Sequence, residues 1–330
     1  MIRILILIVS ISSVYANYKV FRSLQVQVGV TQDFNTGSYK QENYIKLQNL
    51  DISFPNLTGT AFPLYAMLAK YHIQFGDLYT ALKILNEYNE VNPHLKLKES
   101  LKAEIYYSLG IRDSSYYFSK IAYENLPKNS RHYQQYVAEL TYLNDLDQIK
   151  KIFKESKAKE NSEYWINFFA GVINLKSKED KDIDTLAMEA LEKFPENKKI
   201  KTISAYILFG QENVKKSYNS FELGITEFNK GDYDKAFYFF KEAIKLNTVD
   251  YSFYENAGMS LIKAKKHSES LFYLRKVIED FNPKTGKAEY GLGIALNALE
   301  NKEKGCEYFQ AAMKFNYKPA FIDFKINCFK

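Results

Sequence analysis

Glycine and proline are scarce in this chain, whose 330 residues include only 14 Gly and 7 Pro. An all-β sandwich needs a turn every few residues, so this scarcity argues against one and favours long helices joined by short loops. Trp occurs once, at Trp165, and Cys twice, but 27 Tyr and 24 Phe supply ample material for a packed interior. The 45 basic and 39 acidic residues are interleaved, so composition does not indicate a nucleic-acid partner.

The chain also lacks the motifs of the common enzyme and cofactor classes. Thr285-Gly286-Lys287 hints at a phosphate-binding loop, but the first glycine of that loop would fall at Phe281. Ala288 stands where the loop needs a hydroxyl group. There is no His-Glu-x-x-His zinc motif and no Gly-x-Ser-x-Gly nucleophile elbow. We therefore expect no enzymatic activity, no cofactor and no metal site.

Residues 1–16 have the order of a signal peptide. Arg3 precedes an aliphatic run that reaches residue 11, and small residues at Val14 and Ala16 end the segment. The run is shorter than the roughly 20 residues needed to cross a bilayer, although residues 4–21 could serve as a short anchor. We expect a protein that is exported to the periplasm or tethered to the membrane facing outside the cytoplasm. The alternative is a buried N-terminal helix of a cytosolic protein.

Small residues and prolines return along the chain at a spacing of about 34 residues, which is the length of one helix–turn–helix repeat. Small side chains at facing positions let two antiparallel helices approach closely. The recurring positions are Gly76 with Gly110, Ala81 with Ser115, Pro93 with Pro127, and Gly224 with Gly258 and Gly293.

These positions resemble the signature of the tetratricopeptide repeat family. Gly231-Asp232-Tyr233 resembles its turn, and Ala236, Phe240 and Ala243 share one face of the helix that follows. The resemblance implies an all-α fold, in which antiparallel helix–turn–helix repeats stack in a right-handed superhelical solenoid that ends in a capping helix. It also implies a protein that binds other proteins.

The chain divides into segments of different regularity. Residues 17–42 contain a short alternation of apolar and polar residues without a partner strand, and we expect a spacer there. Residues 43–216 are expected to form partly irregular repeats, and residues 217–330 regular repeats with the capping helix.

A second resemblance concerns the setting of the protein. Asn92-Pro93, Leu109-Gly110 and Leu126-Pro127 lie in a stretch similar to the repeat region that follows the last membrane helix in some bacterial O-antigen-ligase-like proteins. Such regions lie outside the cytoplasm and are associated with surface polysaccharide assembly. This chain lacks the membrane spans that carry the ligase chemistry, so the resemblance implies a location and not an activity.

The first helices of stacked pairs line the concave side of a solenoid. In the C-terminal repeats they carry apolar and aromatic side chains, which suit an amphipathic helix or an extended peptide. The alternative is that these side chains pack on neighbouring helices. The predicted groove consists of Phe221, Ile225, Phe228, Glu255, Met259, Ile262, Tyr290, Ile294 and Asn297.

Cys306 and Cys328 lie on either side of a turn marked by Pro319, so they could face each other on antiparallel helices. An exported protein can hold a disulfide, provided that the two α-carbons come within about 7 Å. The alternative is two buried thiols at the interface of the capping helix.

Three functions follow from the sequence. The first is a non-catalytic scaffold or adaptor outside the cytoplasm that binds an unidentified protein or peptide. The second is an accessory component of surface polysaccharide or envelope assembly, which contacts glycan or a glycan-assembly enzyme. The third is an enzyme with an unrecognised site, against which the absence of motifs counts.

Overall fold

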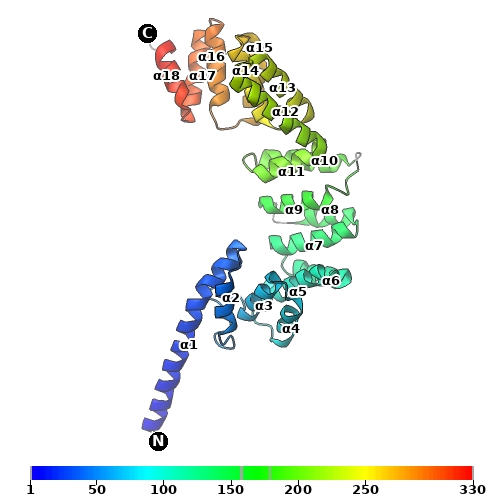
Figure 1. The fold of residues 1–330 in the computed structure, drawn as a ribbon, viewed down its shortest axis with the longest axis vertical. Helices are drawn as coiled ribbons and strands as arrows, with labels where there is room; N and C mark the ends of the chain where they lie inside the picture. The colour runs from blue at the N-terminus through cyan, green and yellow to red at the C-terminus, as the bar shows by residue number, and fades with distance from the viewer. Residues whose placement is uncertain (1, 157–158, 178–179, 329–330) are drawn as a thin grey trace. The chain divides into compact units, whose positions relative to one another are not determined.

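The computed structural model describes residues 2–156, 159–177 and 180–328. These residues form helices and no β-strand, apart from one isolated bridge between Leu57 and Pro63. The chain forms two compact units, one up to Leu175 and one from Lys176 onward, which we call unit 1 and unit 2 (Figure 1). The predicted all-α fold of paired antiparallel helices is confirmed.

Unit 1 begins with one long helix, followed by a short helix and then by successive helix pairs. A single helical turn, η1, lies between the first two pairs. The helices are α1 (Ile2–Thr36), α2 (Gln41–Gln48), α3 (Leu64–Gln74), α4 (Leu78–Glu87), η1 (Pro93–Leu95), α5 (Leu97–Ser108), α6 (Arg112–Asn125), α7 (Ser130–Tyr142), α8 (Leu146–Glu155) and α9 (Ser162–Val172).

Unit 2 continues the same pattern, with a π-helical turn, η2, at the end of one second helix. Its helices are α10 (Lys181–Lys193), α11 (Lys198–Phe209), α12 (Gln211–Lys230), α13 (Tyr233–Leu246), α14 (Tyr251–Lys263), α15 (His267–Lys276), η2 (Val277–Phe281), α16 (Lys287–Ala298), α17 (Lys302–Lys314) and α18 (Lys318–Cys328).

The recurring glycines lie where the two helices of a pair cross. A Cβ atom at Gly224 would come within 2.5 Å of the Phe240 ring on the second helix of that pair. Gly258 meets Leu274 and Gly293 meets Phe309 in the same way, at distances of 2.6 and 2.5 Å. In three successive pairs, therefore, the two helices approach each other closely because a glycine on the first helix faces a large side chain on the second, as the spacing predicted.

Aspartate residues begin several of the second helices. The carboxylate of Asp77 accepts a hydrogen bond from the backbone N–H of Thr80, three residues later in the chain. Asp145 and Asp232 likewise accept from the backbone N–H groups of Gln148 and Lys235. Each cap satisfies a backbone N–H that has no partner within the helix. The Gly-Asp turn of the sequence is thus a local start signal for the second helix of a pair.

The predicted spacer and domain boundary differ from the structure. Residues 17–36 belong to α1, which buries Ser23, Gln27 and Val30 on one face. A lone strand would leave its backbone groups unpaired, whereas a helix satisfies them internally. The boundary predicted after residue 216 falls within α12, which continues without a break to Lys230.

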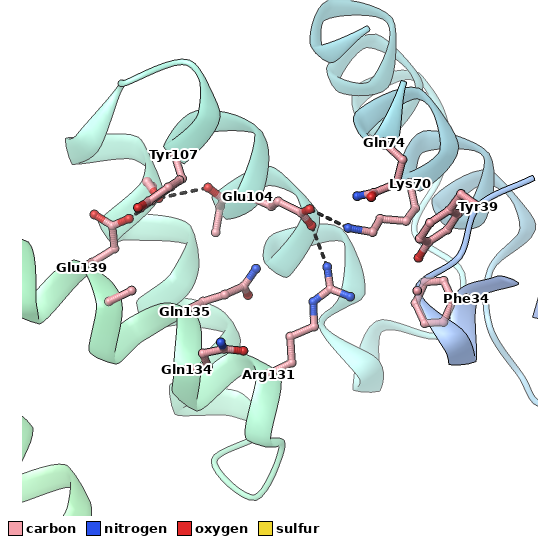
Figure 2. Close-up of a pocket in the computed structure, with 14 residues that line it drawn as sticks. Phe34, Tyr39, Lys70, Gln74, Glu104, Tyr107, Arg131, Gln134, Gln135 and Glu139 are labelled. Atoms are coloured by element: carbon pink, nitrogen blue, oxygen red, sulfur yellow. Dashed lines mark hydrogen bonds and ion pairs between the residues drawn. The ribbon is translucent and has the colours of Figure 1, made fainter. Parts of the chain in front are cut away.

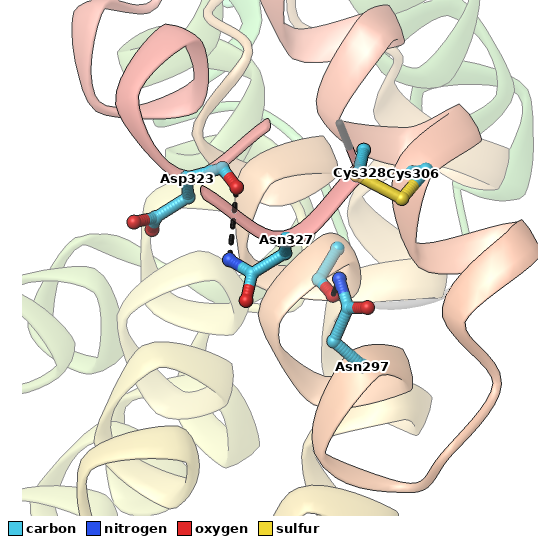
Figure 3. Close-up of a disulfide and its surroundings, with 6 residues drawn as sticks. Asn297, Cys306, Asp323, Asn327 and Cys328 are labelled. Carbon is cyan, nitrogen blue, oxygen red and sulfur yellow. Dashed lines mark hydrogen bonds between the residues drawn. A yellow bond between two sulfur atoms is a disulfide. The ribbon is translucent and has the colours of Figure 1, made fainter. Parts of the chain in front are cut away.

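The structure joins Cys306 on α17 to Cys328 on α18 by a disulfide, with the two α-carbons 5.8 Å apart (Figure 3). The bond holds the last helix against the preceding one. On α18 the side-chain amide of Asn327 also donates to the backbone carbonyl of Asp323, at 2.8 Å. The capping helix is therefore cross-linked to its repeat covalently.

Candidate functional site

The groove predicted in unit 2 is largely closed by packing. Among the first-helix positions of α12, α14 and α16, none of the predicted residues is exposed. Phe221 packs on the rings of Phe240 and Phe253, with centroids 5.4 and 5.1 Å away. The residues that are buried are Glu255, Met259 and Ile262, and those that are half-buried are Phe221, Ile225, Phe228, Tyr290, Ile294 and Asn297.

Polar members of the predicted groove have partners inside unit 2. The Tyr290 hydroxyl donates to Asp323 at 2.8 Å, and the Asn297 side chain donates to the backbone carbonyl of Gly293 at 3.0 Å. Glu255 forms an ion pair with Lys287 at 3.3 Å. These contacts fix the side chains within the stack, which is the alternative that the sequence left open.

A cavity of about 590 Å³ lies instead in unit 1, across the first helices of three successive pairs. Figure 2 shows α3, α5 and α7 supplying side chains to it, while the connection from α1 to α2 forms one wall. We call this cavity the unit 1 pocket. It is lined by Phe34, Gly37, Tyr39, Lys70, Gln74, Ala103, Glu104, Tyr107, Ser115, Arg131, Gln134, Gln135, Ala138 and Glu139.

Two cations converge on one carboxylate in the unit 1 pocket. The Nζ atom of Lys70 lies 2.5 Å from Oε1 of Glu104, and an Arg131 guanidinium nitrogen lies 2.6 Å from Oε2 (Figure 2). Burial lowers the pKa of the Lys70 ammonium, and the Glu104 carboxylate beside it offsets part of that effect. Two positive charges against one negative charge leave this part of the pocket with an excess positive charge.

A second polar network closes the other end of the unit 1 pocket. The buried Ser115 hydroxyl lies 2.7 Å from a carboxylate oxygen of Glu139 and 3.0 Å from the backbone carbonyl of Ala103. Arg112 also reaches Glu139, at 3.3 Å, and its guanidinium lies 4.0 Å from the centre of the Tyr107 ring. Because Glu139 is almost fully buried, these donors satisfy a charge that would otherwise be costly.

The wall of the unit 1 pocket depends on the C-terminal half of α1. Asp33 accepts hydrogen bonds from the backbone N–H of Lys40, from the Asn43 amide and from the Tyr71 hydroxyl, at 2.7 to 2.9 Å. Burial raises the pKa of the Asp33 carboxyl, but these hydrogen bonds outweigh it and the net shift is downward. The charged Asp33 therefore fixes the chain that carries Phe34 and Tyr39 into the pocket.

The unit 1 pocket was not among the predicted sites, although the sequence contains a signal for it. Lys70 and Glu104 are 34 residues apart, and Ser100 and Gln135, which share a hydrogen bond of 2.7 Å, are 35 apart. Residues separated by one repeat occupy equivalent positions on neighbouring first helices. A search for polar residues of opposite character at the repeat spacing would have found the ion pair.

Among the residues that the structure describes, no group of three or more His, Cys, Asp or Glu side chains could hold a metal ion. The polar groups of the unit 1 pocket are amides, hydroxyls and paired charges. Such groups hold a ligand by hydrogen bonds and charge.

No protein-family model matches the chain, and no curated protein matches it. Several of the solved structures it resembles are described as tetratricopeptide repeat proteins. The TPR domain of P58(IPK) is 14% identical, with a TM-score of 0.38, over 90% of this chain and 85% of its own. A tetratricopeptide repeat protein from Parabacteroides merdae is 14% identical, with a TM-score of 0.30, over 92% and 97%.

Another neighbour is YrrB, described as a TPR protein with an unusual peptide-binding site. It is 16% identical with a TM-score of 0.29, over 76% of this chain and 97% of its own. Similarities of this size concern the helical repeat only.

Proposed function

We propose that this chain is a non-catalytic scaffold that binds an extended segment of a partner protein in the unit 1 pocket. The observation that carries the proposal is the placement of polar side chains from three successive first helices around one open cavity. In unit 2 the predicted first-helix positions are buried or half-buried. An extended segment suits the pocket because it can reach all three helices in turn.

The chemistry of the pocket favours a segment that carries a carboxylate. Lys70 and Arg131 already hold the Glu104 carboxylate in a geometry of two charge-assisted contacts. A carboxylate of the ligand could share these donors and balance the excess positive charge. Gln74 and Gln134, which line the pocket and are exposed, offer amides that can pair with the backbone of an extended chain.

Binding of displayed peptides to the full chain tests this proposal. Selected peptides should contain Asp or Glu, and Arg131→Gln should weaken them roughly tenfold, as expected for the loss of one charged contact. Lys120→Gln is the matched control, because Lys120 lies on the second helix α6 outside the pocket. Selection of peptides without acidic residues, or equal binding by both variants, would contradict the proposal.

We further propose that the scaffold acts outside the cytoplasm, to which α1 directs it. Two observations support this location. By length and composition α1 is apolar enough to cross a membrane, with no residue of its most apolar window buried. The disulfide between Cys306 and Cys328 is a bond that persists in oxidising compartments. Recovery of the chain with both thiols free in the cytosol would contradict this location.

The alternative partner is a glycan or a glycan-assembly protein, as the second resemblance implies. Exposed tyrosines such as Tyr79 and Tyr117 offer ring faces to a sugar. Binding to a glycan array that is lost on Tyr79→Ala or Tyr117→Ala, with peptide binding unaffected, would favour this alternative. Turnover of substrate by the purified chain would contradict the non-catalytic assignment.

A further inference from the structure

The N-terminal half of α1 is mostly apolar and exposed. Consecutive residues from Ile4 to Val9 are each 57% to 65% exposed, and Ile2 and Val14 reach 75% and 70%. Figure 1 shows this part of α1 standing clear of the other helices of unit 1. A helix that docks on a protein partner covers one apolar stripe and keeps a polar opposite face. The six residues from Ile4 to Val9 point in all directions around the helix, and the polar residues that follow up to Tyr18, namely Ser10, Ser12, Ser13 and Asn17, are small and uncharged. Surroundings that are apolar on every side therefore suit this segment.

A lipid bilayer is the surrounding that fits this segment. At 1.5 Å per residue, the 17 residues from Ile2 to Tyr18 are about 25 Å long, which is at the short end of the helices that cross a bilayer. Tyr15, Tyr18 and Phe21 are 56% to 59% exposed at the end nearer to unit 1. Aromatic residues at this position are typical of the membrane interface.

The C-terminal half of the same helix is part of the folded body. The Gln27 side-chain amide donates to the carbonyl of Leu57 at 3.3 Å and accepts from the N–H of Gly59 at 3.0 Å. Together with the contacts of Asp33, these hydrogen bonds fix the position of α1 along its axis relative to the rest of unit 1. Lys19 pairs with Asp51 at 2.6 Å, so contact with the body begins directly after the apolar part.

Nothing in the sequence of α1 provides a hinge between these halves. Residues 2–28 contain no Gly and no Pro, and helices bend sharply almost only at such residues or at bulges. The first glycine, Gly29, lies within the docked part, where a Cβ atom would come within 2.5 Å of the Asn43 side chain. The two halves therefore behave as one rigid element.

We infer that α1 stays on the mature chain as a single-span membrane anchor and holds the unit 1 pocket at a fixed, short distance from the bilayer. The inference rests on the proposed location outside the cytoplasm and decides what the sequence left open, namely cleavage after Ala16 or retention. Cleavage there would leave the aromatic rings of Tyr18 and Phe21 exposed to water at the new end of the helix, whereas retention of α1 places them at the membrane interface.

The first test is the fate of the full chain produced in a bacterial host. We expect it in the membrane fraction, resistant to alkaline carbonate, with an intact mass that includes residues 2–16. A chain that begins at Asn17 overturns the inference alone and leaves the proposed export in place. A chain recovered intact from the cytosol overturns both, and release by carbonate overturns the membrane span.

A matched pair of variants ties the result to the apolar segment. Ile6→Glu combined with Val9→Glu should lower the membrane-bound fraction at least about tenfold, because carboxylates are costly at the centre of a bilayer. Val28→Glu is the control, since Val28 is 72% exposed on the docked half and should leave retention unchanged. Equal retention by both would mean that α1 does not span, and a soluble dimer would mean that a second copy covers it.

The distance between the unit 1 pocket and the bilayer can be measured separately. Both native cysteines are in the disulfide, so a dye attaches only to a cysteine that is introduced. A dye attached to Gln134→Cys in the unit 1 pocket should show a narrow distribution of distances to acceptor dyes in phosphatidylcholine vesicles. Insertion of three glycines after Arg22 should broaden that distribution while Tm stays unchanged. A broad distribution in both chains overturns the rigid coupling.

Discussion

In unit 1 the first helices of successive pairs line a pocket with Lys70, Glu104 and Arg131, whereas in unit 2 the equivalent helices pack Phe221 and Met259 against their neighbours. The scaffold of paired helices is the same in both. What differs is the chemistry of a few positions on the first helices, which are mainly apolar in unit 2 and carry charges in unit 1. The comparison shows that one helical repeat can either bury these positions or line a cavity with them, depending on the side chains placed there.

The two units also differ in how they are held together. Unit 2 relies on close packing of a small residue against a large one, on the disulfide and on the α18 cap. Unit 1 is held in addition by polar contacts between successive helices, such as the ion pair of Lys70 with Glu104 and the hydrogen bond of Ser115 to Glu139. Both units bury polar side chains, and each of these is costly unless it is satisfied.

The largest expected effect is the loss of a core ring in unit 2. Phe240 is fully buried and fills the space above Gly224, so Phe240→Ala should lower the free energy of unfolding by about 3–5 kcal/mol. Tyr238→Ala on the same helix removes a ring that is 58% exposed and should change it little. Chemical denaturation gives the values, and hydrogen exchange should show the change in unit 2 but not in unit 1.

Removal of the disulfide should be the next largest effect. The bond closes a loop of 22 residues, for which chain entropy predicts a loss of about 3 kcal/mol on opening. We expect Cys306→Ser with Cys328→Ser to speed hydrogen exchange in α17 and α18, while peptide binding in unit 1 is unchanged. Weaker binding in unit 1 would show that the two units do not act separately.

A pH effect is expected from the buried His132 of unit 1. Burial, together with the neighbouring Arg131, lowers the pKa of His132 to about 4. The unfolded chain binds this proton near pH 6.5, so the stability contributed by neutral His132 is complete above that pH and is lost as pH falls towards 4. The full loss is at most about 3 kcal/mol.

Denaturation of the wild type and of His132→Gln between pH 7 and pH 4 measures this effect. The variant should lose less stability over that range, because carboxylates elsewhere titrate equally in both chains. Parallel curves for the two chains would rule out His132 as the buried group responsible.

The smallest effect concerns the polar network at the end of the unit 1 pocket. Ser115→Ala removes one donor from the buried Glu139 carboxylate and should cost about 1–2 kcal/mol. Ser108→Ala on the exposed side of α5 removes only a hydroxyl bonded to the carbonyl of Glu104 and should cost under about 0.5 kcal/mol. Thermal melting of the two variants compares them directly, and equal losses would mean that Glu139 is satisfied without Ser115.

Much of the fold could be predicted because its signals are local or periodic. At the Gly-Asp turns, the aspartate caps the second helix of a pair by a hydrogen bond to a backbone N–H three residues later. The glycines at the repeat spacing mark where the two helices of a pair cross. The C-terminal half of α1 could not be predicted, since its buried stripe of Ser23, Gln27, Val30 and Asp33 is mostly polar. A stripe of that kind has no hydrophobic period, and its role depends on partners in distant loops.

The sequence by itself determined that the helices form and that they pair in order, because capping, turn formation and close approach act between neighbours along the chain. Only the tertiary structure decided which first-helix positions line a cavity and which pack against neighbouring helices. That depends on whether side chains from helices about one repeat apart meet ring against ring, as Phe221 meets Phe253, or cation against carboxylate, as Lys70 meets Glu104. Packing excludes solvent in the first case, and in the second the charged groups border an open cavity.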